Sequence, residues 1–391
     1  MKMVHEAPWH QARLTAAQGW EVLSTEIVGI TQGSGRTLAM DAVALCDLPT
    51  YTTSAMDGFA VSGRGPWRIV GEVKAGQPMT EKLLPGSSVR IATGAVIPEG
   101  SFGIIRWENG EVVDDLLHGD VSEGQDIRPK AHECRAGEIL TGAGAVLNPG
   151  WVGLLAAVGY DEVRVFKKPR VALILLGDEI QLHGVPNGGL VRDALGPQLP
   201  GWLIRMGAEV VSTQYVSDEL NLVVAALSDV IHDCDLVVTT GGTADGPRDH
   251  LHTALSVLSA TLHVDRVKVR PGHPMLLASV PNKNGKRVPV LGLPGNPQSA
   301  IVGLLTLGQP VIAAFFGREC ENLHLVPTRH DLRSPQDFTR LVLGNIVGGH
   351  FEMGDHLGSA MLRGLAHSSG FAIVDTEVVE AGALVRWLPL P

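Results

Sequence analysis

Apolar and polar positions in the second half of the chain follow two different periods. Apolar residues recur at helical spacing over 217–234, which predicts a helix there. Residues 193–207 also predict a helix, which the prolines of this segment are expected to break. Four short apolar segments, each followed by a loop, have the length of buried strands: RVALILLGDEI (170–180), AEVVSTQYV (208–216), DLVVTTGGTADG (235–246) and RVPVLGLPGNP (287–297). Strands that alternate with helices predict a mostly parallel sheet with helices on both faces.

The regions on either side of this pattern differ from it. A helix is expected to begin at Thr15 and to carry Trp20, Leu23 and Ile27 on one face. Short strand-like runs separated by Gly and Pro follow, and the chain then returns to a strand, a helix beginning at Asn148–Pro149 and another strand. The end of the chain, including GSAMLRG (358–364), is expected to be β structure.

These changes of pattern predict a multidomain α/β plus β protein. The β-rich segment interrupts an otherwise continuous first domain, so it is interpreted as an insertion. The predicted domains are an elongated, discontinuous first domain (1–40 and 139–166), an inserted β domain (41–138), an α/β domain (167–318) and a small C-terminal β domain (319–391).

Composition narrows the function classes. With 391 residues, 45% of them hydrophobic, the chain is long enough for several cores. The formal charge of −10 argues against a nucleic-acid groove or an anionic membrane surface. Four scattered cysteines favour reduced thiols, and the apolar stretch 301–316 is interrupted by Gln309 and Pro310 and too short to span a bilayer. A soluble cytoplasmic protein is expected.

Three loops are expected to leave the same edge of the predicted sheet, where the carboxyl ends of parallel strands meet. One carries Asp178 and Glu179, the second carries Gly241 and Gly242, and the third is the turn PGNP (294–297). In that turn Asn296 is a good helix N-cap and Pro297 suits the first helical position. The turn is either the rim of an oxyanion site or a tight turn and nothing more, and its own sequence favours neither interpretation.

A row of basic residues runs between these loops. Strand alternation would place Arg266, Lys268 and Arg270 on one face. Carboxylates beside glycine-rich backbone and a cationic row suit a phosphate-bearing ligand with Mg²⁺. Each feature alone is compatible with a turn or a solvated surface, so the hypothesis depends on their convergence.

Six motifs in order connect the chain to a known family: TTSAMDGFAV, RIATGAVIPEG, LLGDEI, DLVVTTGGTADGPRD, VRPGHP and LGLPGNPQSA. Together they resemble the molybdopterin molybdenumtransferase family, which includes MoeA and the E domain of gephyrin. The resemblance implies Mg²⁺-dependent insertion of molybdate into adenylylated molybdopterin, with release of AMP. It also implies cytoplasmic homodimers whose protomers have four domains, among them a MogA-like three-layer α/β domain and a C-terminal β-barrel. The family's site lies between the α/β domain of one subunit and other domains of the partner.

The resemblance also assigns roles to single residues. Asp57, Glu179 and Asp249 fall on catalytic positions and would also hold the metal. The forked guanidinium group of arginine matches the geometry of a tetrahedral oxyanion, which is consistent with a substrate-binding role for the basic residues. That set consists of Thr93, Asp218, Gly241, Gly242, Arg266, Arg270, Pro294, Pro297, Arg340 and Ser359.

The chain departs from the family's pattern at several polar positions. Cys134 stands where the family has an aspartate, Leu176 where it has a threonine, Leu195 where it has an asparagine, and Ala244 replaces a hydroxyl. Losing such groups weakens contacts to a polar ligand. The alternatives are therefore a catalytically weak paralogue that binds molybdopterin or its nucleotide as a carrier, sensor or scaffold, and an enzyme acting on another phosphorylated pterin or nucleotide. Retention of the acids Asp57, Glu179 and Asp249 favours the enzyme. Cys134 as a soft ligand for molybdenum or copper is a further hypothesis.

Overall fold

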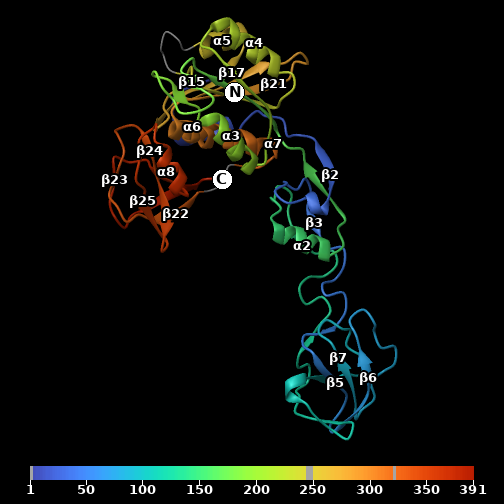
Figure 1. The fold of residues 1–391 in the computed structure, drawn as a ribbon. Helices are drawn as coiled ribbons and strands as arrows, with labels where there is room; N and C mark the ends of the chain where they lie inside the picture. The colour runs from blue at the N-terminus through green and yellow to red at the C-terminus, as the bar shows by residue number, and fades with distance from the viewer. Residues whose placement is uncertain (1–2, 244–249, 320–322) are drawn as a thin grey trace. The chain divides into compact units, whose positions relative to one another are not determined.

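The computed structural model describes residues 3–243, 250–319 and 323–391, which form two compact units (Figure 1). The first unit contains the chain up to Glu26, Gly35–Thr37 and Phe166–Pro391, and the second contains Ile27–Ser34 and Leu38–Val165. The division into four domains stays a prediction. Asp249 and Ala244 lie outside the described residues.

A mixed sheet forms the centre of the first unit. Its order is β17 (Glu209–Val216), β14 (Arg170–Leu176), β18 (Leu236–Thr240), β21 (Arg287–Leu293), β20 (Leu276–Pro281), β19 (Thr261–Arg270), β24 (Thr339–Val347), β26 (Gly370–Val374), β28 (Leu384–Pro389) and β22 (His324–Pro327). β1 (Val4–Pro8) pairs in parallel with β19. The four strands from β17 to β21 are parallel, as predicted, whereas β20 is antiparallel to both of its neighbours.

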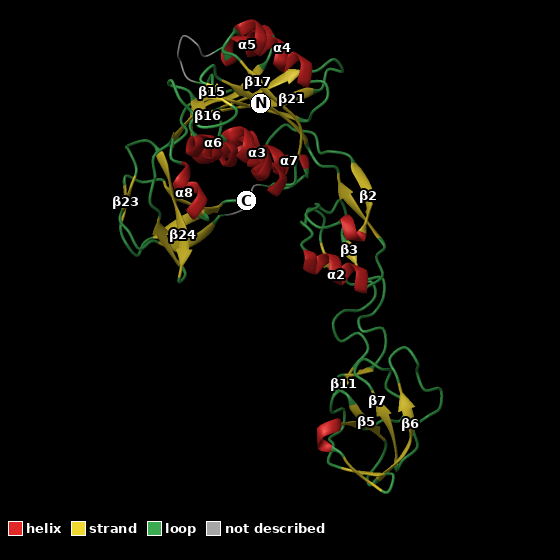
Figure 2. Ribbon diagram, viewed as in Figure 1, coloured by secondary structure: helices red, strands yellow, loops and turns green. Residues whose placement is uncertain are grey.

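Helices cover both faces of the parallel strands (Figure 2). α4 (Leu220–Val230) and α5 (Leu251–Val257) pack on the face that contains Ala172 and Ile174. α1 (Trp9–Ala16), α3 (Leu195–Arg205), and the run from α6 (Pro297–Gly303) to α7 (Gln309–Phe315) pack on the face of Leu173 and Leu175. Because both faces are covered, every residue from Val171 to Leu176 is buried, which explains the continuous apolar run.

Three predictions of local structure, two of helices and one of β structure, are wrong in detail. The helix near the N-terminus is α1, and the Thr15–Ile27 segment turns back at Gly19, whose φ is +81°, before entering β2 (Thr25–Gly29). Residues of the segment 358–364 enter a helix, α8 (Leu362–His367), in place of a strand. Pro200 lies inside α3 without ending it, because Leu195, Leu199 and Leu203 anchor that helix in the core.

The helical run Pro297–Phe315 also continues through Gln309–Pro310, against the sequence expectation. Its middle, η3 (Leu304–Gly308), has wider π-type turns, which accommodate the missing N–H and the ring of Pro310. Among the described residues this is the one helix long and apolar enough to cross a membrane, with a mean hydropathy of 1.5, and 83% of that window is buried inside the protein. It packs as a core helix.

The C-terminal strands form a small barrel. β24, β26, β28 and β22 are successive antiparallel neighbours, and β25 (His350–Met353) pairs with the other edge of β24. A bridge between Thr328 and Phe351 links the end of β22 to β25, and the Arg329 N–H donates to the Phe351 carbonyl over 3.0 Å. The parallel pairing of β19 with β24 joins this barrel to the α/β sheet.

The second unit contains a six-stranded sheet of order β8 (Gly103–Arg106), β5 (Gly58–Val61), β7 (Ser87–Ile91), β6 (Trp67–Val73), β10 (Leu116–His118) and β9 (Glu111–Val113). Beside it lie the short pairs β4 (Thr53–Ser54) with β11 (Ile127–Arg128) and β3 (Ala42–Val43) with β12 (Ile139–Thr141). α2 (Pro149–Ala157) begins as predicted, with Asn148 Oδ1 accepting from the Trp151 N–H over 3.0 Å, and β13 (Glu162–Phe166) follows it.

Candidate functional site

The carboxyl ends of five strands meet at one edge of the large sheet. β17, β14, β18 and β21 are parallel neighbours, and β19 runs in the same direction because β20 is antiparallel to both β21 and β19. The loops that begin after Leu176, Thr240 and Leu293 therefore leave the same edge, as predicted, together with the end of β19 at Arg270. This edge is where ligands bind in open α/β sheets.

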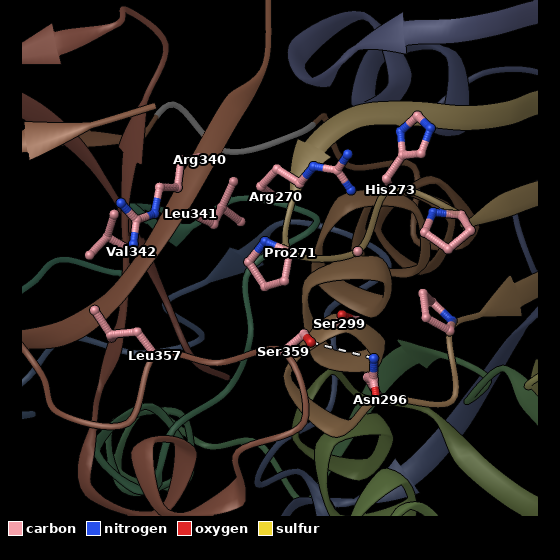
Figure 3. A pocket seen from close by; sticks show the side chains of 13 residues that line it. Arg270, Pro271, His273, Asn296, Ser299, Arg340, Leu341, Val342, Leu357 and Ser359 are labelled. Carbon is pink, nitrogen blue, oxygen red and sulfur yellow. Dashed lines mark hydrogen bonds between the residues drawn. The ribbon is translucent and has the colours of Figure 1, made fainter. Parts of the chain in front are cut away.

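A pocket of about 360 Å³ lies at the end of β19 (Figure 3). The parallel register pairs Arg270 with Arg340, so a basic residue of the α/β sheet stands beside one from the barrel. The PGNP turn and the loop containing Ser359 complete the wall. Of the residues predicted to bind substrate, Arg270, Pro294, Arg340 and Ser359 line this pocket; Arg266 and Pro297 do not. Arg266 has a left-handed backbone, with φ +63°, and its N–H donates to the Met275 carbonyl.

The two guanidinium groups of the pocket are held apart. Arg270 lies over the ring of Phe338, with its Cζ 4.7 Å from the ring centroid, and points toward His273 (Figure 3). Arg340 donates from Nη1 to the Arg333 carbonyl over 3.0 Å. Neither guanidinium has a carboxylate partner among the residues described, so both retain donors for an anion in the pocket.

His273 is a pocket residue that the motif analysis did not single out. Its Nδ1 is 2.8 Å from the Val267 carbonyl oxygen, which only accepts, so Nδ1 donates this bond and the orientation of the ring is fixed. Glu6 Oε1 lies 3.6 Å from Nε2. In the sequence, His273 could have been found as the histidine of the motif VRPGHP, which directly follows the cationic row.

The PGNP turn differs from its predicted capping. Asn296 occupies the N-cap position of α6 but its side chain does not cap the helix; its Nδ2 lies 3.4 Å from Ser359 Oγ. The Gln298 N–H donates to the Ser359 carbonyl over 2.9 Å, so the neighbouring loop supplies the cap. Gln298 Nε2 also donates to the carbonyls of His356 and Met361. The turn therefore fixes the loop that carries Ser359, a role of Gln298 that the sequence analysis missed.

The glycines after β18 are required by close backbone approach. Gly241 has φ +81°, and a Cβ on it would lie 2.8 Å from the Leu176 carbonyl oxygen. Its N–H donates to the Leu293 carbonyl over 2.9 Å, which ties this loop to the PGNP turn. Gly242 has φ +63° and packs against the Leu176 side chain. Both glycines thus set the path of the loop along the sheet edge.

Acidic side chains gather at the carboxyl ends of β14 and β17. The Asp218 N–H donates to Asp178 Oδ1 over 3.2 Å, and the Glu179 carboxylate folds over Gly177. Burial, together with the negative charges of Asp178 and Glu179, raises the pKa of Asp218. Within the described ranges no three acidic, His or Cys side chains are arranged as a complete metal-ligand group.

The predicted residues of the second unit meet each other. Asp57 Oδ1 accepts from the Thr93 N–H at 2.6 Å and from its hydroxyl at 3.0 Å. The Thr93 backbone N–H, followed by its hydroxyl, lowers the pKa of Asp57, so this exposed carboxylate is ionised at neutral pH. Asp57 and Glu179 belong to different units and Asp249 lies outside the described residues, so the metal set of Asp57, Glu179 and Asp249 stays a prediction.

Comparisons with known proteins agree with the motifs. Residues 7–159 match the family model described as the MoeA N-terminal region (domain I and II), and 172–314 match a probable molybdopterin binding domain. A molybdopterin molybdenumtransferase of a Nostoc species is 31% identical over 395 residues, covering 94% of this chain and 89% of the relative. The chain belongs to the molybdopterin molybdenumtransferase family. Membership confirms the expectation of an enzyme, a transferase of molybdenum cofactor biosynthesis.

Other relatives give the same picture. A molybdopterin molybdenumtransferase of Staphylococcus aureus is 28% identical over 326 residues, covering 80% of this chain and 76% of its own. A molybdopterin biosynthesis MoeA protein from Pyrococcus horikoshii superposes over the full length of both chains with a TM-score of 0.75 and 26% identity. A second MoeA structure from that organism superposes with a TM-score of 0.79 at 22% identity, which supports the fold.

Three of the departures from the family's pattern, those at residues 134, 176 and 195, serve packing in this member. Leu176 and Leu195 are buried in the two cores of the α/β sheet. Cys134 is 4% exposed and packs with Ala44 and Val158, and its burial raises the pKa of the thiol. A buried, protonated thiol in an apolar cluster is not a soft metal ligand, so that hypothesis for Cys134 is not supported.

Proposed function

We propose that this chain inserts molybdate into adenylylated molybdopterin and releases AMP. The observation that carries the proposal is the pocket in which Arg270 and Arg340 stand in register beside the PGNP turn. Two guanidinium forks without carboxylate partners in the described chain suit a tetrahedral dianion such as molybdate, or the phosphate groups of the substrate. Molybdate is itself the nucleophile, so these residues bind and orient, and no covalent intermediate on the protein is required.

We propose Mg²⁺ at the acidic edge formed by Asp178, Glu179 and Asp218, with Asp249 as a further ligand. Burial, together with the neighbouring carboxylates Asp178 and Glu179, raises the pKa of Asp218, and a bound cation would stabilise its ionised form. Carboxylate oxygens are hard ligands, and Mg²⁺ is usually held by one or two of them together with substrate phosphates, so a complete protein cage is not needed. When bound, the ion neutralises charge that develops on the adenylate phosphate.

We further propose a cytoplasmic homodimer in which Asp57 and Thr93 of one subunit complete the pocket of the partner. In support, the pair is exposed, already oriented, and located in a unit that does not contain the pocket. Mixing Asp57→Asn and Arg270→Ala proteins, assayed at a molybdate concentration at which each variant alone turns over slowly, tests this arrangement. If the site is shared between subunits, mixed dimers contain one intact site and activity returns. If each chain supplies its own site, mixing restores nothing.

Single-turnover release of AMP from adenylylated molybdopterin, with purified protein, Mg²⁺ and molybdate, tests the reaction itself. Release that depends on molybdate supports the transferase. Tight binding of the adenylate without release of AMP would assign the chain to the carrier or sensor class. Absence of both binding and release would mean that this member acts on another substrate.

A further inference from the structure

The end of the β5–β8 ladder places a tryptophan opposite Asp57. Gly58 pairs with Arg106 as the last pair of these antiparallel strands, and Trp107 N–H donates to the Asp57 carbonyl over 3.2 Å. On the other side of β5, Ile91 of β7 also pairs with Gly58, and Thr93 follows two residues later. Trp107, Asp57 and Thr93 therefore lie next to one another at the same end of three adjacent strands.

Trp107 has the properties of a fixed stacking surface. Its ring is parallel to that of Phe59, with 5.0 Å between centroids and an interplanar angle of 6°. Phe59 is 2% exposed and part of the core, whereas the Trp107 side chain is 57% exposed. All seven tryptophans lie in the described ranges, and Trp107 alone among them is exposed. Because Phe59 covers one face, the orientation of the indole is set and its other face is open.

The strand end that carries Trp107 is held rigidly. Arg106 donates from Nε and Nη2 to both carboxylate oxygens of Asp126, at 2.8 and 2.9 Å. The Asp126 carbonyl in turn accepts from the Ala55 N–H over 2.8 Å, which connects this pair to the loop leading to Asp57. The positions of the indole and the carboxylate are thus coupled through backbone and side-chain bonds.

The neighbouring groups point to the class of ligand. Both bonds from Thr93 reach Asp57 Oδ1, and Oδ2 accepts no bond from the residues that the structure describes, so it remains available to an N–H donor. A fused nitrogen heterocycle offers N–H donors at its edge and an aromatic face for stacking. We infer that Trp107 stacks on the fused heterocycle of the substrate, the pterin or the adenine, while Asp57 accepts from its edge. This inference rests on the proposed function and names a specificity-determining residue within it.

Three variants test the inference in the AMP-release assay: Trp107→Ala, Trp107→Phe and the control Leu84→Ala, which removes another exposed apolar side chain of the same unit. Loss of one stacked base changes affinity by about tenfold, so Trp107→Ala is expected to raise the KM for the adenylate by about tenfold. The kcat should stay within about twofold, since stacking acts equally on bound substrate and transition state. Trp107→Phe should recover most of the KM, and Leu84→Ala should match the unmodified protein.

Indole fluorescence separates the two rings and does not require turnover. The difference between the unmodified protein and Trp107→Phe reports Trp107 alone. Quenching of this difference by AMP assigns the adenine, and quenching by a simple pterin assigns the pterin. No quenching by either, or an unchanged KM in a Trp107→Ala protein with normal melting, overturns the inference. Loss of the dimer with an unchanged KM also overturns it and assigns Trp107 to subunit packing. An unmodified protein that quenches but releases no AMP contradicts the proposed function and leaves the stacking assignment supported.

Discussion

Charged residues of the second unit and those at the edge of the α/β sheet have opposite environments. In the second unit, here called the β unit, Asp57 accepts two bonds from Thr93 and its pKa is lowered, and Arg106 pairs with Asp126 through two bonds. At the edge of the α/β sheet, the pKa of Asp218 is raised by burial and by neighbouring carboxylates. There Arg270 rests on an aromatic ring and Arg340 on a backbone carbonyl.

This difference separates charged groups that protein partners already hold from charged groups that await a ligand. In the β unit Asp57 and Arg106 are bound by neighbouring residues, so their positions are fixed. The α/β edge keeps excess negative charge at Asp178, Glu179 and Asp218, and excess positive charge at Arg270 and Arg340, in separate places. A divalent cation would balance the first group and an oxyanion the second. Substitutions at the α/β edge should therefore change metal and oxyanion dependence, and loss of a single supporting bond in the β unit should have a smaller effect.

The largest effect is expected for Glu179→Gln. Removing one charge from the acidic edge should lower kcat for AMP release by about 100-fold or more, which is the effect of losing one preorganised electrostatic contact. The melting temperature should hardly change, because Glu179 is exposed. Glu209→Gln, an exposed glutamate at the amino end of β17 and hence at the opposite edge, is the matched control. A Glu179→Gln protein with normal, Mg²⁺-dependent kcat would remove this residue from the mechanism.

The second-largest effect is expected for Arg270→Ala, which should weaken the binding of molybdate. A hydrogen bond to a charged group contributes about 1.5–3 kcal/mol, so we expect the KM for molybdate to rise by about 10- to 100-fold. Arg270→Lys should retain part of the affinity because it keeps the charge but loses the fork. Titration of molybdate in the single-turnover assay measures both. Arg164→Ala, which removes an exposed arginine of the β unit, should be neutral; an equal loss there would mean that bulk charge, and not the pocket, attracts the anion.

Gly241→Ala tests the loop that connects the two halves of the α/β edge. The added Cβ would meet the Leu176 carbonyl oxygen at 2.8 Å in a backbone with φ +81°, so we expect a loss of about 1–3 kcal/mol in the free energy of unfolding. Gly201→Ala is the control, because no atom lies within 4 Å of its Cβ and it is helical. That change should stabilise the protein by about 0.5–1 kcal/mol. Denaturant unfolding compares them, and a stable Gly241→Ala protein would show that this loop can take another path.

The sequence was most informative where a short pattern reflects a local cause. The apolar run of β14 and the cap at Asn148 were recognised correctly, because burial and capping act over a few residues. The convergence of three loops followed from the direction of parallel strands. Motifs in order then identified the family.

Long-range contacts caused the errors. The capping of α6 could not be read from PGNP, because the carbonyl that serves Gln298 comes from Ser359, more than sixty residues later. The pairing of Arg270 with Arg340 depends on the register of β19 and β24, which no local pattern encodes. Residues 15–27 show helical spacing, but Gly19 and the β-branched residues of β2 favour a turn and a strand in the folded protein.

The smallest effect is expected for Thr93→Val, which tests whether the Thr93 hydroxyl serves only to fix Asp57. The variant keeps the backbone N–H bond to Asp57 and loses the hydroxyl bond, so the pKa of Asp57 should rise toward its ordinary value. If ionised Asp57 is required, the acidic limb of the pH profile of kcat/KM should move to higher pH, with little change at neutral pH. Thr93→Ser, which restores a hydroxyl, should return the limb to its original position. If Thr93→Val loses much of its kcat/KM at neutral pH and Thr93→Ser restores it, the hydroxyl contacts substrate directly. The contrast between the two units would then be weaker than the pairing of their charged groups indicates.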